Sequence, residues 1–150
     1  MNSGTGRGRA ASRVGRAIVI AAGLAGLLGP GPLSNATAGG GDAPEVRYER
    51  FVRHGGQTDL TIRFTARDSG PLRVAISREY LAAFHLQQIL PMPRGVHAAG
   101  DMLSYTFEGP QETGQVELKF VLQPDELGFH EASISAGAGS AASIRQLTYP

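Results

Sequence analysis

The sequence of 150 residues contains no cysteine and no tryptophan, and Lys119 is its single lysine. Without cysteine the chain can form no disulfide and carry no lipid-modified thiol, so the lipoprotein class is excluded and the fold depends on its hydrophobic core alone. A long hydrophobic run is also missing. The uninterrupted apolar stretch Ala17–Leu28 has twelve residues, whereas a spanning helix needs about 20.

The order of residue types around this stretch is typical of an export signal. Four arginines precede it, the small residues Ala36-Thr37-Ala38 follow it, and no acidic residue occurs before Asp42. A basic zone, a short apolar zone and a small-x-small end are the features of a secretory signal peptide. We therefore predict a signal peptide over residues 1–38, cleaved after Ala38. The alternative is an uncleaved membrane anchor whose arginines stay on the cytoplasmic side.

The export segment also accounts for the apparent basicity of the chain. The 14 basic and 13 acidic residues give a formal charge of +1, and four of the arginines lie before Gly39. Ten basic and thirteen acidic residues remain after it, a net charge of −3. These basic residues are scattered, so we expect no nucleic-acid partner. Residues 39–45 are rich in glycine, which predicts a flexible linker. Residues 46–150 are numerous enough for one domain, and we expect a single domain there.

Beyond the linker, hydrophobic and polar residues alternate in short runs. This period of two predicts antiparallel strands with one buried and one solvated face. The clearest runs are Leu60–Phe64, Leu72–Ile76, Leu103–Phe107, Val116–Leu122 and Ala132–Ala136, with Arg47–Arg53 and Ile144–Tyr149 as first and last strands. Glycine and proline clusters separate them. Seven to eight strands at this spacing predict an all-β, two-sheet sandwich.

One segment interrupts the alternation. Residues Glu79–Phe84 favour a short helical turn, with Ser77 available as its N-cap. We expect the hydrophobic side chains of this turn to plug one end of the sandwich and those that follow it to rejoin the core. The expected plug consists of Tyr80, Leu81 and Phe84, and the expected core residues are Leu86, Ile89 and Leu90.

The order of hydrophobic positions and turn prolines resembles bacterial extracytoplasmic immunoglobulin-like domains, including those of surface adhesion repeats. The positions are Leu72-Arg-Val-Ala-Ile-Ser, Tyr80-Leu81, Phe84-His-Leu, Ile89-Leu90-Pro91-x-Pro93, Leu103-x-Tyr-x-Phe, Val116-x-Leu-x-Phe-x-Leu-x-Pro124 and Gly128. The chain is also similar to small exported or membrane-anchored bacterial proteins of unknown function that end in an aromatic residue and proline. The resemblance spans Arg47–Pro150 and implies an immunoglobulin-like sandwich without catalytic residues. Antibody variable domains are excluded as close relatives, because the cysteine pair and tryptophan are missing.

Two glycine-rich motifs have a chemical interpretation that the rest of the chain does not support. His54-Gly55-Gly56 is similar to the oxyanion loop of lipases, but the chain has no G-x-S-x-G nucleophile motif. Residues 137–142 match a degenerate dinucleotide loop, but only eight residues follow, too few for the required helix. We interpret the first motif as a turn between strands and the second as a hairpin loop.

The ionisable residues form no recognisable site in the sequence. The four histidines (His54, His85, His97 and His130) have no metal-ligand spacing, and no cysteines support them. Asp125-Glu126, and Glu108 with Glu112, lie in expected turns and fall short of a calcium ligand set. We therefore assign no catalytic, cofactor-binding or metal-binding residue and expect no cofactor.

The sequence accordingly predicts an exported, non-enzymatic contact or accessory module of the bacterial cell envelope, located in the periplasm, at the cell surface or anchored in the cytoplasmic membrane. Its expected partner is an envelope or integral membrane protein, which would add a strand to an exposed sheet edge. The candidate edges are Arg47–Arg53 and Ser143–Tyr149. Two alternatives remain: a ligand- or metal-binding module or enzyme built from separated strands around His85, His97, His130 and nearby acids, and a structural spacer.

Overall fold

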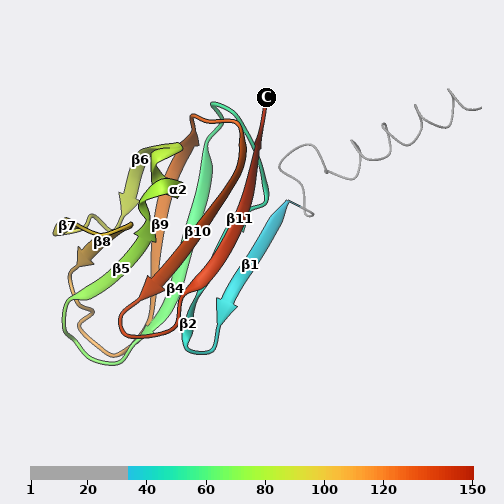
Figure 1. Ribbon diagram of the computed structural model, residues 1–150. Coiled ribbons are helices and arrows are strands. Elements are labelled where there is room, and N and C mark those ends of the chain that lie inside the picture. The colour runs from blue at the N-terminus through green and yellow to red at the C-terminus, as the bar shows by residue number, and fades with distance from the viewer. Residues whose placement is uncertain (1–33) are drawn as a thin grey trace, which may run out of the picture.

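The computed structural model describes residues 34–150, which form two packed β-sheets (Figure 1). The five-stranded sheet A has the order β1-β2-β4-β9-β6, and the six-stranded sheet B has the order β3-β11-β10-β5-β8-β7. The predicted all-β, two-sheet architecture is confirmed. In chain order the strands are β1 (Asn35–Gly40), β2 (Ala43–Glu49), β3 (Phe51–Arg53), β4 (Thr58–Ala66), β5 (Leu72–Ser77), β6 (Phe84–Leu90), β7 (Gly95–Ala99), β8 (Met102–Phe107), β9 (Gly114–Pro124), β10 (Gly128–Ala136) and β11 (Ala142–Tyr149).

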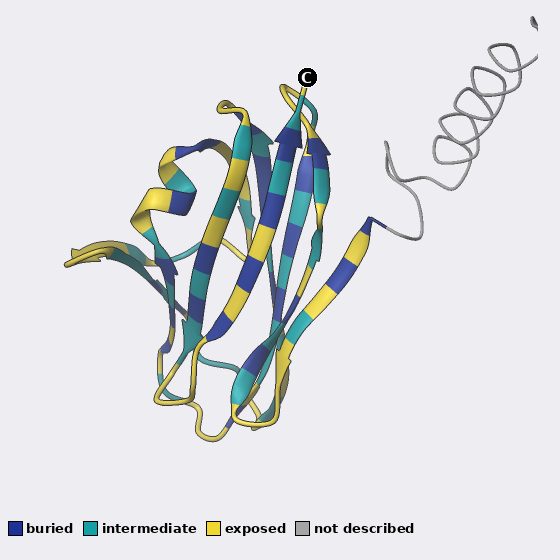
Figure 2. Cartoon of the chain, turned by 45° about the vertical axis from the view of Figure 1, so that its right-hand side comes forward, coloured by how far each residue is buried: buried dark blue, intermediate teal, exposed yellow. Residues whose placement is uncertain are grey.

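The predicted alternation places one face of each central strand in the core. Buried and more exposed residues alternate along β4, β5, β10 and β11, which appears as colour banding in Figure 2. Phe120 of β9 has no exposed surface, and its ring lies 5.2 Å from that of Tyr105 and 6.5 Å from that of Phe107, both edge-on. The core therefore joins the two sheets through aromatic contacts between β9 and β8, as expected of a sandwich.

The expected number of seven to eight strands is wrong, because residues 34–150 contain eleven. One reason is that the first predicted strand, Arg47–Arg53, is divided at Arg50. The chain leaves sheet A there and enters sheet B as β3, which pairs in parallel with β11. Alternation of side chains does not reveal such a change of sheet, because the period continues through the bend.

The domain boundary at residue 46 also needs correction. Residues expected to form the end of a signal peptide and a flexible linker form instead the β1–β2 hairpin, in which Ala36 pairs with Tyr48 and Ala38 with Val46. The glycines allow a tight turn between the two strands: Gly39, Gly40 and Gly41 all have positive φ. The remaining expected signal residues, 1–33, lie outside the described residues, and none of the helices within 34–150 has the length and hydrophobicity to cross a membrane.

The helical turn is present as α2 (Arg78–Ala82). Tyr80 and Phe84 are buried, with their ring centroids 4.7 Å apart and tilted by 37°, and Leu81 packs partly buried against the core. These residues plug one end of the sandwich as predicted. Ser77 does not cap the helix with its side chain. Its hydroxyl donates to the carbonyl of Ser133 and accepts from the Ser133 amide, which ties β5 to β10 instead.

Candidate functional site

The sandwich has two flanks of different character. One flank contains the edge strands β1 and β3, and the other contains the edge strands β6 and β7 (Figure 1). In the described part of the chain β6 pairs only with β9, and β7 pairs only with β8. Each of these strands therefore has one side of its backbone without a strand partner.

The β6–β7 flank carries most of the exposed large hydrophobic side chains of residues 34–150. Four of the six belong to the stretch from Leu86 to Val96. They are Leu86, Leu90, Met92 and Val96, exposed by 42, 45, 84 and 48 %, and we call these four residues the apolar flank. The expectation that Leu86 and Leu90 rejoin the core is therefore wrong, whereas Ile89 is partly buried against it.

The backbone explains why these side chains are exposed. A register shift between Leu86 and Gln88 interrupts the pairing of β6 with β9, so the strand does not stay flat on the core. Val96 is paired with the buried Tyr105, but the β7–β8 hairpin projects from the sandwich, and β7 is exposed along most of its length (Figure 2). The apolar flank thus consists of side chains on the edge strands β6 and β7 and in the loop that joins them.

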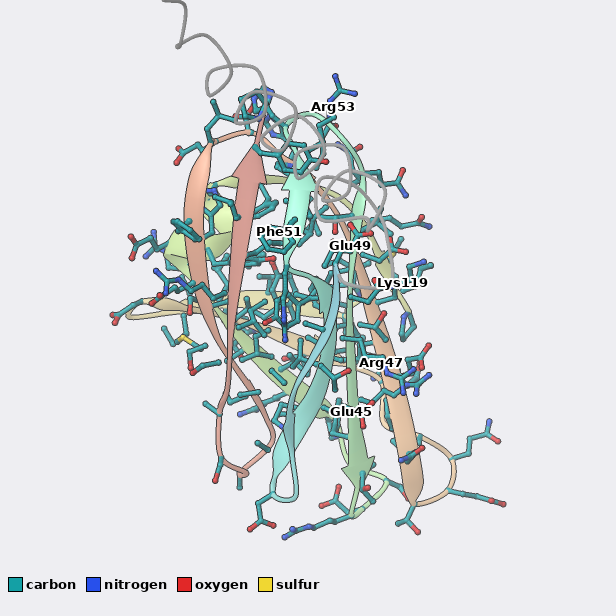
Figure 3. The ribbon with its side chains drawn as sticks, turned by 90° about the vertical axis from the view of Figure 1, so that its right-hand side faces the viewer. Glu45, Arg47, Glu49, Phe51, Arg53 and Lys119 are labelled. Carbon is teal, nitrogen blue, oxygen red and sulfur yellow. The ribbon has the colours of Figure 1, made fainter. Side chains whose placement is uncertain are left out.

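The two edge strands of the opposite flank are bridged at one point. The Ser34 carbonyl accepts a hydrogen bond from the Arg50 amide at 2.6 Å, and the Ser34 hydroxyl donates to the carbonyl of Phe51 at 3.1 Å. The start of β1 therefore bonds to the backbone at the beginning of β3. Figure 3 views this side, with Phe51 and Arg53 on β3 and Glu49 at the end of β2.

Neither of the two segments predicted as exposed sheet edges forms an edge over its whole length. In Arg47–Arg53, residues 47–49 lie between β1 and β4, and only the three residues of β3 form an edge. In Ser143–Tyr149, β11 pairs with β10 on one side, and β3 pairs on the other side only with Leu147–Tyr149. The prediction of an edge is therefore wrong for these last three residues, because the strand after the Arg50 bend pairs with the end of the chain. Ser143–Gln146 has a strand partner on one side only within the described residues.

The outer face of sheet A is a solvated, charged surface. Arg47 pairs with Glu45 at 3.0 Å and Lys119 with Asp59 at 2.7 Å, while Arg63 bonds to a glutamate on β9. Arg47 and Lys119 both extend from this face in Figure 3. Alternating charges of this kind contribute little individually and keep the face hydrated.

A polar notch of about 300 Å³ opens on that face where β2 diverges from β4. It is lined by Asn35, Glu49 and Asp59, among other residues, and the Thr58 hydroxyl donates to the Glu49 carboxylate at 2.9 Å. One carboxylate oxygen of Asp59, Oδ1, is buried without a partner. The side chain of Asp59 is nevertheless 44 % exposed, and its other oxygen is paired with Lys119. The notch is therefore an open, solvated depression and not a preformed binding site.

Three histidines gather around the turn between β9 and β10. His54 and His130 donate from Nε2 to the carbonyls of Asp125 and Glu126, and His85 Nε2 lies 3.3 Å from the Asp125 carboxylate. The structure thus brings His85 and His130 to one turn, with His54 in place of His97, which lies on β7. One ring nitrogen of each of these histidines therefore contacts the turn between β9 and β10. No group of three or more potential metal ligands occurs within residues 34–150.

The other motifs discussed from the sequence lie in turns and loops between strands. His54-Gly55-Gly56 forms the turn between β3 and β4, and residues 137–141 form the hairpin loop between β10 and β11, as interpreted from the sequence. Glu108 pairs with Arg94 at the base of the β7–β8 hairpin. Glu112 lies in the bend before β9.

A buried polar chain crosses the core between α2 and β2. The Tyr80 hydroxyl donates to Gln146 Oε1 at 2.8 Å, and Gln146 Nε2 donates to the carbonyl of Glu49 at 2.7 Å. Burial, and secondarily the nearby phenol of Tyr48, raise the pKa of Tyr80 above its ordinary value of 10.0. This chain of bonds anchors the plug to β11 and contains no nucleophile or acid poised for chemistry near neutral pH.

Replacing Tyr80 by phenylalanine should leave Gln146 Oε1 buried without its donor and cost about 1–3 kcal/mol. The raised pKa adds a dependence on pH. Above about pH 10 the unfolded chain releases the phenolic proton while the folded chain retains it, so stability present below pH 10 decreases as pH rises. Between about pH 8 and about pH 11, the midpoint of urea unfolding should therefore fall more for the wild type than for Tyr80→Phe. Equal declines would contradict the assignment.

Sequence comparison gives no family for this chain: no family model and no curated protein matches it. Among solved structures it resembles the cohesin module from Clostridium perfringens ATCC13124 family 33 glycoside hydrolase, with a TM-score of 0.49 and 14 % identity over 75 % of this chain and 98 % of that module. At this level of similarity we infer nothing about partners from the resemblance. The functional interpretation rests on the apolar flank.

Proposed function

We propose that the chain is an immunoglobulin-like, non-enzymatic contact module of the bacterial cell envelope, and that its apolar flank binds an extended segment of a partner protein. The observation that carries this proposal is the concentration of exposed hydrophobic side chains on the edge strands β6 (Leu86, Leu90) and β7 (Val96) and in the loop between them (Met92). Exposed apolar side chains on a sheet edge are unfavourable for an isolated protein and are typical of a docking surface.

The chemistry of β6 favours an extended partner. The strand has seven residues, and among them only His85 is ionisable. Natural edge strands usually carry charges that prevent the addition of another strand, and β6 carries none along Leu86–Leu90. A partner strand would bond to the free side of the β6 backbone, while its apolar side chains contact the flank.

The proposed location of the module rests on the sequence alone. The basic and apolar zones before Ser34 support export to the periplasm or cell surface, with anchoring in the cytoplasmic membrane as the alternative. The partner is then an envelope or integral membrane protein. We do not propose the metal-binding alternative, because the gathered histidines already bond to the Asp125–Glu126 turn.

Two charged substitutions in the apolar flank should remove binding without unfolding the domain. Leu90→Asp and Met92→Asp alter exposed side chains, so each should change the free energy of unfolding by no more than about 0.5–1 kcal/mol. Capture of the envelope partner from crosslinked cells should nevertheless fall about tenfold or more, because a buried unpaired charge opposes docking.

The matched control is Leu127→Asp, which places the same charge on a leucine that is 56 % exposed but lies outside the apolar flank. It should capture the same protein as the wild type, in the same amount. Equal capture by the flank variants, or an equal loss with Leu127→Asp, would contradict the proposed surface.

A further inference from the structure

The segment predicted to end in a cleavage site is built into the sandwich as its first strand. Asn35, Ala36, Thr37 and Ala38 pair with Glu49, Tyr48, Arg47 and Val46 in register. Ser34 has no exposed surface and Ala36 is 8 % exposed, so the contact continues to the start of the strand. These residues have the burial of a domain strand and not of a discarded peptide.

A cut after Ala38 would remove contacts that no other part of residues 34–150 replaces. The Arg50 amide and the Phe51 carbonyl would lose their partners on Ser34. The strand β2 would become the edge of sheet A, and the fully buried Val46 would lose its neighbour on β1. The new terminal ammonium would lie at Gly39, where the backbone turns closely over the Pro44 carbonyl.

We infer that the mature protein retains Ser34–Ala38, and that any proteolytic removal of the apolar N-terminal segment occurs on the N-terminal side of Ser34. The bond between Ala38 and Gly39 is then not the processing site, although Ala36-Thr37-Ala38 fits the small-x-small pattern. Ala36 and Ala38 are paired positions of the first strand of sheet A, and the glycine that follows them packs closely on β11. A Cβ on Gly39 would lie 3.0 Å from that of Ala142 on β11.

The test is the N-terminus of the full chain after expression in a bacterial host, determined by intact mass and N-terminal sequencing of the recovered protein. The expected first residue is Ser34 or any residue before it, which includes an uncleaved chain. A first residue at Asn35 or beyond, Gly39 in particular, would overturn the inference. The result is independent of partner binding, so it separates this inference from the proposed function.

A variant strengthens the measurement. Ala38→Gln removes the small residue that a cut after position 38 requires. Its N-terminus should be the same as that of the wild type, with only the mass of the substitution added. Accumulation of a longer chain in the variant would show that the wild type is cut after Ala38 and would contradict the inference.

Discussion

Replacing Phe120 by alanine is expected to lower the free energy of unfolding by about 3–5 kcal/mol, the usual cost of deleting a buried phenylalanine ring. Phe120 has no exposed surface, and β9 lies between β4 and β6 in sheet A. Its ring meets Tyr105 and Phe107 of sheet B edge-on. The cavity would therefore open between the sheets, and urea denaturation followed by circular dichroism would measure the loss.

Phe129 provides the matched control for this prediction. It is 64 % exposed on the outer face of β10, where its ring lies 4.7 Å below the guanidinium of Arg145. Phe129→Ala removes the same atoms, but little buried surface and one exposed cation–π contact, so the loss should be about 1 kcal/mol or less. Similar losses for the two variants would show that Phe120 does not join the sheets.

Replacing Gly39 by alanine is expected to cost about 2–5 kcal/mol. Its φ is +82°, and an added Cβ would lie 1.9 Å from the carbonyl oxygen of Pro44. The left-handed backbone alone costs a non-glycine residue about 1–2 kcal/mol, and the clash with a backbone atom adds an overpacking cost of about 1–3 kcal/mol. The β1–β2 hairpin should open, which thermal denaturation and amide exchange along β1 would detect.

Gly41→Ala separates the clash from the backbone strain. Gly41 has a φ of +68°, and nothing lies within 4 Å of the position where its Cβ would stand. This variant should therefore lose only about 1–2 kcal/mol, the cost of the left-handed conformation. If both variants lost the same amount, the tight approach of Gly39 to Pro44 would be refuted.

Features that depend on local sequence were predictable. The alternation in Leu60–Phe64 or Val116–Leu122 identifies a strand and its buried face without knowledge of its neighbours, because side chains alternate across every strand. The helical turn at Tyr80 and the plug formed by Tyr80 and Phe84 follow from the hydrophobic residues that interrupt the alternation, whereas the expected cap by the Ser77 side chain does not form. These predictions fixed the architecture as a two-sheet sandwich.

Features that depend on partners distant in sequence were not predictable. The glycine-rich composition around Gly39–Gly41 has the same pattern in a flexible linker and in a tight hairpin, and only pairing with β2 distinguishes them. Leu86 and Leu90 are hydrophobic whether a strand is central or at an edge, so their exposure depends on the position of β6 in sheet A. The candidate site was missed for this reason.

The sheet order relates the two proposals in space. Because β1 and β6 are the opposite edges of sheet A, β1 lies across the sandwich from the apolar flank (Figure 1). If the N-terminal segment anchors the chain, the domain therefore presents Leu90 and Met92 on the side away from its point of attachment. A partner can reach that side without displacing β1.

The most direct test of the central claim is site-specific photocrosslinking in cells from the two opposite edges of sheet A. A photoreactive residue is placed at Gln88, which is exposed on β6, and in a separate chain at Thr37, which is exposed on β1. We expect one discrete crosslinked envelope protein from Gln88, which disappears when Met92→Asp is added, and none from Thr37. Crosslinking from Thr37 instead of Gln88, equal crosslinking from both, or none from either would contradict the claim.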